Sequence, residues 1–292
     1  MGLFLKKWAK YSVRLCLVIG FHYLCIKFTK MMEKAQQVID YMLSMRNERQ
    51  REVLMRFFKT APGEYGEGDE FLGLKVPQTR AVVAEAKDLP LDEVPVLLVN
   101  RWHEVRLCGL LLLVVRFEAW AKKKWYSDPK AVRQRDAIVR IYLDHAQWAN
   151  NWDLVDLSAP KILGHWLLLP TFLGGEGGLP ELNMDYKWQT LDGLAESPNL
   201  WLQRMSMVCS WKPTQQSDPS FCLRYAEKHL RHPHDLMHKA VGWMLREMGK
   251  RVSIDLLRDF LRQHGHEMHR TTLRYAIEKM DAEERQMWME TT

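Results

Sequence analysis

The chain has 292 residues, 47% of them hydrophobic and 27% charged, a balance that is typical of a globular protein with a large buried core. Its five cysteines are scattered, without a C-x-x-C pair or histidines at ligand spacing. This argues against a disulfide framework or a structural zinc site and favours a reducing compartment. The net charge of +6 comes from residues 1–30, because the remaining 36 of the 42 basic residues face 36 acidic ones. A nucleic-acid surface therefore requires local segregation of charge.

Residues 1–30 differ from the rest of the sequence. Their mostly apolar stretch 15–28 contains His22 and Lys27 and is shorter than the roughly 20 residues of a membrane-spanning helix. It also lacks the small-residue cleavage site of a signal peptide. Three interpretations stay open: a weakly membrane-associating helix, an additional packed helix, and an upstream translation start, which we favour. We expect no stable membrane insertion, and one main domain over residues 31–292.

From Met32 onward, nearly every segment repeats its apolar residues with the period of a helix, and none alternates for long enough to predict a strand. Pro77 suits the first turn of a helix, and Pro129 restarts another. Asn150 and Asn151 suit the N-cap of a helix that includes Asp153, an acid favoured by the helix dipole. Besides that helix, we expect helices at about residues 35–45, 48–59, 77–88, 91–99, 104–122, 129–148, 199–210, 219–229, 237–250, 253–263, 271–279 and 281–289.

Short turns separate most of these helices, and helical pairs in a chain of this length are typical of an α-solenoid of the HEAT or armadillo kind. The most loop-like stretch holds four glycines and Pro180 within residues 174–180. No strand precedes it and no Gly-Lys-Ser/Thr follows, so we predict a flexible connection rather than a phosphate-binding loop. The predicted fold class is all-α, a curved solenoid of HEAT-like repeats.

Residues 150–159 place a carboxylate on the apolar face of the predicted helix. Trp152, Val155 and Asp156 lie at i, i+3 and i+4, so they share one face. An ionised carboxylate loses several kcal/mol on leaving water unless it is paired. Asp156 therefore either has a buried partner, such as an arginine, or lines a cleft where it has a chemical role.

Two later helices carry comparable features. Within residues 199–208, Arg204 lies on a mostly apolar stripe and needs an anion, either Asp156 or a backbone phosphate of bound DNA; the sequence leaves both open. Within residues 239–250, Trp243 shares a face with charged side chains. Its indole can stack on a base or hold a cation there, whereas a tryptophan wedged between helices is the alternative.

Basic residues gather in two segments. Residues 101–140 hold ten basic residues and four acids, which indicates either a solvated charged face or a phosphate-binding edge. Residues 269–275 open a helix with two arginines near its first turn, where phosphate binds well. The predicted DNA contacts are Lys124, Arg204, Arg246, Lys250, Arg270 and Arg274.

Three motifs occur in a recognisable order: NWDLVD at 151–156, NLWLQR at 199–204 and KAVGWMLREMGK at 239–250. Together they resemble the AlkD-like family of DNA alkylation-repair glycosylases. Further agreement comes from FLGLKVPQTR at 71–80, WHEVRLCGLLLLV at 102–114 and HRTTLRYAIEKM at 269–280. The resemblance covers the chain from about Met32 to the C-terminus and excludes residues 1–30 and the glycine-rich stretch.

The resemblance implies a right-handed superhelix whose concave, positively charged face binds duplex DNA containing alkylated purines. It implies hydrolysis of the N-glycosidic bond of N3- and N7-alkylated purines without a metal or redox cofactor and without a deep base pocket. Position by position, it makes Asp156 the catalytic carboxylate, Trp152 and Trp243 the active-site tryptophans, and Arg204 a phosphate-binding cleft arginine. We expect a monomer in the cytoplasm that is associated with the nucleoid when bound to DNA.

The implied chemistry suits these side chains. An alkylated purine is already cationic, so its departure leaves mainly the charge that develops on the sugar. A fixed carboxylate can stabilise that charge and orient the attacking water, and electron-rich indoles favour a cationic base. The main alternative is a non-catalytic solenoid that binds DNA or a protein, which would share the fold but leave Asp156 without a chemical role.

Overall fold

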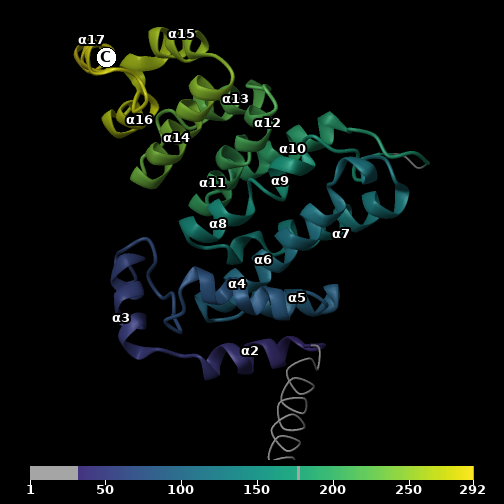
Figure 1. Ribbon diagram of the computed structural model, residues 1–292. Helices are drawn as coiled ribbons and strands as arrows, with labels where there is room; N and C mark the ends of the chain where they lie inside the picture. Colours follow the sequence, from purple (N-terminus) through teal and green to yellow (C-terminus); the bar gives the residue numbers. More distant parts are fainter. Residues whose placement is uncertain (1–31, 176–177, 292) are drawn as a thin grey trace, which may run out of the picture.

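The computed structural model describes residues 32–175 and 178–291, and these residues fold as helices joined by turns and loops (Figure 1). Within those ranges, strand pairing is limited to two isolated bridges, Glu70 with Trp102 and Thr171 with Glu181. The predicted all-α solenoid is thereby confirmed. Residues 1–30, for which the sequence left three interpretations open, lie outside the described residues.

The helices form a curved stack, in which α8 lies between α3 on one side and α11 and α14 on the other (Figure 1). The first half contains α2 (Ala35–Ser44), α3 (Glu48–Phe57), α4 (Val76–Glu85), α5 (Val94–Leu98), α6 (His103–Trp120), α7 (Pro129–Asp144) and α8 (Trp152–Ser158). The second half contains α9 (Leu163–Trp166), α10 (Met184–Glu196), α11 (Leu200–Val208), α12 (Trp211–Gln215), α13 (Ser220–Lys228), α14 (Asp235–Arg251), α15 (Ile254–His264), α16 (Arg270–Ala276) and α17 (Ala282–Thr291). Short 3₁₀ helices occur at Leu91–Glu93, Lys123–Trp125, Ala146–Trp148 and Gly265–Glu267.

Most predicted helices are confirmed with small changes at their ends, but α9, α10 and α12 were missed. Helix α10 escaped prediction because Lys187 interrupts its apolar period. The Lys187 side chain is fully buried, and its Nζ donates to the backbone carbonyls of Leu167 at 3.3 Å and Leu169 at 2.7 Å. A lysine that caps carbonyls inside the core is indistinguishable, in the sequence, from a solvent-exposed one.

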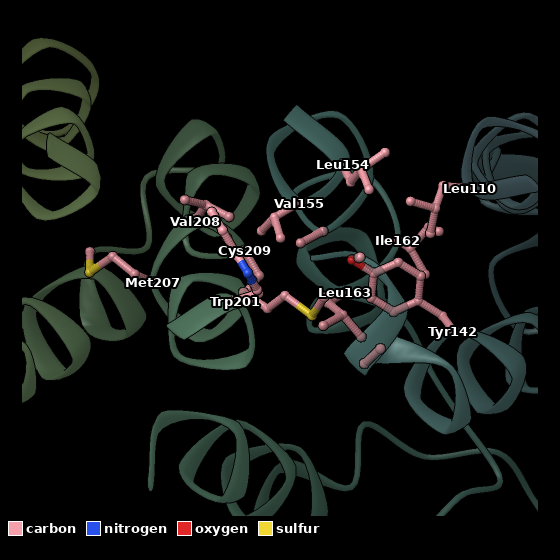
Figure 2. Packing of buried hydrophobic residues seen from close by; sticks show 14 of the residues in the cluster. Leu110, Tyr142, Leu154, Val155, Ile162, Leu163, Trp201, Met207, Val208 and Cys209 are labelled. Carbon is pink, nitrogen blue, oxygen red and sulfur yellow. The ribbon is translucent and has the colours of Figure 1, made fainter. Parts of the chain in front are cut away.

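The core runs continuously through the stack, with α6 at the centre of its first half. Helix α6 packs against α4, α5, α7 and α8, and most of its residues are buried. The cluster continues into the second half, where Figure 2 shows Val155 of α8, Leu163 of α9 and Val208 of α11 together. This shared core fixes α8 relative to α6 and α11.

Some arginines of the basic run at residues 101–140 bind within the protein. Arg135 is buried and donates to the backbone carbonyls of Trp120, Trp125, Tyr126 and Pro170, so it holds two connections against α7. Arg116 donates to the carbonyl of Leu89, and Arg101 pairs with Glu70. The segment is therefore only in part the solvated or phosphate-binding face that its charge suggested.

Helices α14 and α16 approach closely at Gly242. A Cβ atom there would lie 2.5 Å from the carbonyl oxygen of Thr272 and 2.5 Å from Cβ of Tyr275.

We expect Gly242→Ala to lower the free energy of unfolding by about 1–3 kcal/mol, because overpacking forces the helices apart. Gly193→Ala in α10 is the matched control. No atom lies within 4 Å of its Cβ, so it should raise stability by up to about 1 kcal/mol. Urea unfolding of both variants checks this, and equal stability of Gly242→Ala and wild type would contradict it.

Candidate active site

Helix α8 presents Trp152 and Asp156 on one side, one turn apart. Asn151 is buried and caps the helix, with its side-chain oxygen accepting the N–H of Trp152 at 2.9 Å. Val155 and Ala159 are fully buried, whereas Trp152 and Asp156 remain partly accessible. The face predicted from the i, i+3, i+4 spacing is therefore the boundary between the core and an accessible surface.

The Asp156 carboxylate forms a bidentate ion pair with Arg204 of α11. Arg204 Nε and Nη2 donate to the two carboxylate oxygens, each at 2.8 Å, and Nη1 donates to the carbonyl of Leu236 in α14. The Arg204 side chain is 6% exposed and that of Asp156 is 16% exposed. Of the two anions considered for Arg204, the structure contains Asp156. A contact between Arg204 and a DNA phosphate stays a prediction.

The ionisation of Asp156 reflects opposing influences. Burial raises the pKa of its carboxyl above the ordinary value, and the charge of Asp153 adds to that rise. The guanidinium of Arg204 lowers the pKa through its charge and its hydrogen bonds. We infer that this bidentate pairing keeps Asp156 ionised at neutral pH, because the pair neutralises the carboxylate where water is scarce.

Trp152 belongs to an aromatic cluster that includes the end of α3. Its ring stacks on Phe58, with centroids 5.4 Å apart, and meets the edge of Phe57 at 5.9 Å. Phe57 is 59% exposed, and α3 itself has no buried residue, so buried Phe58 anchors the end of this helix. The cluster thus presents an exposed aromatic ring beside Trp152, which sequence reasoning missed.

Tyr65 is a second residue that the sequence did not single out. Its hydroxyl shares a hydrogen bond with Trp152, and the indole N–H must be the donor. Its ring meets Trp201 of α11 edge-on at 6.2 Å, and the charge of Lys239 in α14 reaches it. The loop over residues 61–70 therefore contacts α8 and α11 and lies within reach of the charge on α14. Gly66 permits this, because a Cβ there would collide with the carbonyl oxygen of Phe58.

A buried charge network lies behind this cluster. His103, at the start of α6, has Nδ1 2.7 Å from Asp69 and Nε2 2.9 Å from Asp153. Arg106 pairs with the other oxygen of Asp69. Burial would lower the pKa of His103, but the two carboxylates outweigh it and raise the pKa to about 9. Asp153, expected only to suit the helix dipole, is thus a buried partner of an imidazolium.

Trp243 is half-buried and packs against the core from α14. It lies two turns after Leu236, whose carbonyl binds Arg204, which places it about 10 Å further along the helix axis. The predicted apolar side of α14 is confirmed, since Val241, Met244, Leu245 and Met248 are buried. Trp243 therefore contacts the core and keeps an accessible part, while its stacking on a base or a cation stays a prediction.

Of the predicted DNA contacts, Arg270 and Arg274 are exposed on α16. The first turn of α16 lies beside that of α14, because the rings of His238 and His269 stack 4.0 Å apart. Arg270 therefore lies near the end of α14 that binds Arg204. Arg274 contributes to a cavity between α16 and α17.

The other predicted contacts are placed differently. Arg246 pairs with Glu278 and Glu247, so its charge is already neutralised. Lys250 is exposed, but it lies about 20 Å along α14 from Leu236. Helix α6 begins at His103 and its 18 residues span about 27 Å, so Lys124, which follows the end of α6, lies far from His103. The ammonium of Lys124 lies over the ring of Trp125. The structure does not bring Lys124 or Lys250 beside Asp156.

Within residues 32–175 and 178–291, no three His, Cys, Asp or Glu side chains are placed to share a metal ion. Cys108, Cys209 and Cys222 are buried as free thiols. Across the same ranges, no helix is long and apolar enough to cross a membrane.

The His103 network predicts a pH-dependent stability. The pKa of His103 is raised from 6.5 to about 9 in the folded state, so its contribution is fully present below pH 6.5 and is lost as the pH rises through 9. Lys187, whose pKa burial lowers to about 7, changes stability in the opposite direction over this range. The difference between wild type and His103→Gln isolates the histidine. We expect it to shrink by a few kcal/mol between pH 6.5 and 9.5 in urea unfolding, and a constant difference would refute a charged His103.

Comparison with known proteins identifies the family of this chain. A family model described as DNA alkylation repair enzyme matches residues 38–280. A solved structure described as "Predicted DNA alkylation repair enzyme from Enterococcus faecalis" is 14% identical, with a TM-score of 0.55, over 81% of this chain and 97% of that one. That likeness shows a shared fold. No curated protein matches the chain significantly. Because the family model spans most of the sequence, the chain belongs to the family of DNA alkylation repair enzymes.

Proposed function

We propose that this protein is a monofunctional DNA glycosylase that hydrolyses the N-glycosidic bond of cationic N3- and N7-alkylated purines in duplex DNA. One observation carries the proposal: the Asp156 carboxylate is held in a fixed orientation by Arg204 beside the accessible ring of Trp152. Membership of a DNA alkylation repair family supplies the substrate class.

Asp156 would act on the sugar. As the bond to a cationic base breaks, positive charge develops on the sugar, and a nearby carboxylate stabilises it. Two hydrogen bonds from Arg204 fix both oxygens, so little reorganisation is needed during the reaction. The same carboxylate can orient the attacking water. No strong general acid is required, because the leaving base is already activated by its charge.

The aromatic residues would favour the cationic base. Trp152 and Trp243 are the two tryptophans that the family resemblance assigns, and Phe57 adds an exposed ring beside Trp152. Aromatic faces attract cations more strongly than neutral groups, so such rings discriminate an alkylated purine from a normal one. Selectivity would then come from charge recognition at an accessible surface.

Arg204 would have a role in addition to the phosphate contact that the resemblance implies. Its guanidinium is occupied by Asp156 and the Leu236 carbonyl, so we assign it to positioning Asp156. Further phosphate contacts would come from exposed basic residues, above all Arg270, whose guanidinium also donates to the carbonyl of Met289 in α17. The protein would act as a monomer in base excision repair, without a cofactor, in the cytoplasm and at the nucleoid.

Asp156→Asn tests the catalytic role. The amide keeps the size of the side chain but loses its charge, so we expect release of 7-methylguanine and 3-methyladenine to slow roughly 100-fold or more, with DNA binding retained. Asp192→Asn is the control, because Arg224 forms a bidentate pair with Asp192 between α10 and α13. Chromatography of bases released from methylated duplex DNA measures both variants.

Each outcome has a definite meaning. If Asp192→Asn keeps wild-type activity while Asp156→Asn loses it, the loss belongs to this carboxylate. If the wild type binds DNA but releases no base from any alkylated duplex, the glycosylase proposal fails and the protein is a DNA-binding solenoid. If the wild type also fails to bind DNA, a protein partner for the solenoid becomes the working function.

DNA affinity should depend on the position of each basic residue. We expect Arg270→Gln to weaken duplex binding roughly 3- to 10-fold, because it removes a phosphate contact near the site. Lys124→Gln, which removes the same charge beyond the far end of α6, should leave the affinity unchanged. Fluorescence anisotropy with a labelled duplex measures both, and a larger loss in Lys124→Gln would place the DNA on another face.

A further inference from the structure

The charge balance of the buried network depends on His103. Both ring nitrogens face a carboxylate, and only the imidazolium can donate from both. Asp69 already receives a guanidinium from Arg106, whereas Asp153 has no other cationic partner among the described residues. His103 is therefore the side chain that neutralises Asp153.

Asp153 connects this network to the candidate active site. It lies three residues before Asp156 on the same helix, and its negative charge raises the pKa of the Asp156 carboxyl. One oxygen of Asp153, Oδ1, is buried without a hydrogen-bond partner among the described residues, so apart from the dipole of α8 little else compensates its charge. Losing the charge of His103 would leave that negative charge acting on Asp156.

A second connection runs through stacked rings. The imidazole of His103 stacks on Phe71 with centroids 4.4 Å apart and lies 5.0 Å from Phe58. Phe58 in turn stacks on Trp152. His103 thus supports both residues that α8 presents, Asp156 through charge and Trp152 through packing.

We propose that His103 is a positioning residue of the candidate active site, whose imidazolium neutralises Asp153 and so keeps Asp156 available as a carboxylate. The effect of His103 on base release rests on the proposed function, whereas its effect on the ionisation of Asp156 does not. The groups facing His103 are Asp69 from the loop, Asp153 from α8 and Arg106 on its own helix. Asp156 is faced by Arg204 from α11, by Asp153 of its own helix, and by the uncharged phenol of Tyr142 in α7.

Two substitutions should move the titration of Asp156 in opposite directions. His103→Gln leaves Asp153 uncompensated and should raise the pKa of Asp156 by about one pH unit. Asp153→Asn removes the repelling charge and should lower it. The double variant loses both charges, so its titration should return close to that of the wild type. If His103→Gln fails to fold, Asp153→Asn and the double variant still decide.

Carboxyl ¹³C chemical shifts of aspartate-labelled protein measure this titration directly, with Asp156 identified by its absence from Asp156→Asn. His165→Gln serves as control, because burial lowers the pKa of His165 to about 4 and no carboxylate of the described residues is among the groups that shift it. That variant should leave the Asp156 titration unchanged. Activity is measured in parallel, and the acid limb of the pH–rate profile should follow the Asp156 pKa in each variant, with DNA affinity within about twofold of wild type.

A purely structural His103 predicts a different result. Its variants would unfold more easily, while the Asp156 titration and the pH–rate profile stayed where they are in the wild type, and this would overturn the inference. If the wild type releases no base, the proposed function fails, but the ¹³C titrations still test the coupling between His103 and Asp156. The two failures are therefore distinguishable.

Discussion

The candidate active site depends on the ion pair between Asp156 and Arg204. It joins three helices, because Arg204 belongs to α11, binds the carboxylate of α8 and reaches the carbonyl of Leu236 in α14. Removing either partner would leave a largely buried charge, which typically costs several kcal/mol. The pair therefore adds to the shared core in holding α8, α11 and α14 together.

Two groups of side chains surround this pair, a buried network of charged residues and a cluster of aromatic rings. His103, Asp69, Asp153 and Arg106 form a closed network behind α8, in which two positive groups balance two negative ones. Aromatic rings pack against this network, from buried Phe71, which stacks on His103, to exposed Phe57. A reaction that develops positive charge would thus take place between rings that attract cations and a carboxylate whose own surroundings are nearly neutral.

The sequence predicts the parts of this arrangement that depend on local periodicity. The shared face of Trp152 and Asp156 follows from helical spacing, as does the apolar side of α14. The partner of Arg204 does not, because the two residues are 48 positions apart and a phosphate satisfies the same chemistry. Tyr65 and His103 were missed because their roles arise only when a loop and a helix start meet α8. Buried charges such as Lys187 and Arg135 look like surface residues in any sequence pattern.

Because the Asp156–Arg204 pair is buried, ionic strength should affect DNA binding and the proposed bond cleavage differently. Mobile ions screen exposed charges beyond about 8 Å at physiological salt, but they do not enter the space between two side chains that are 6% and 16% exposed. If Arg270 and Arg274 contact the DNA backbone as proposed, added salt would weaken that attraction, while the field of the buried pair at the sugar would be unchanged. The protein would lose substrate in concentrated salt long before it lost the ability to cleave a bond that it holds.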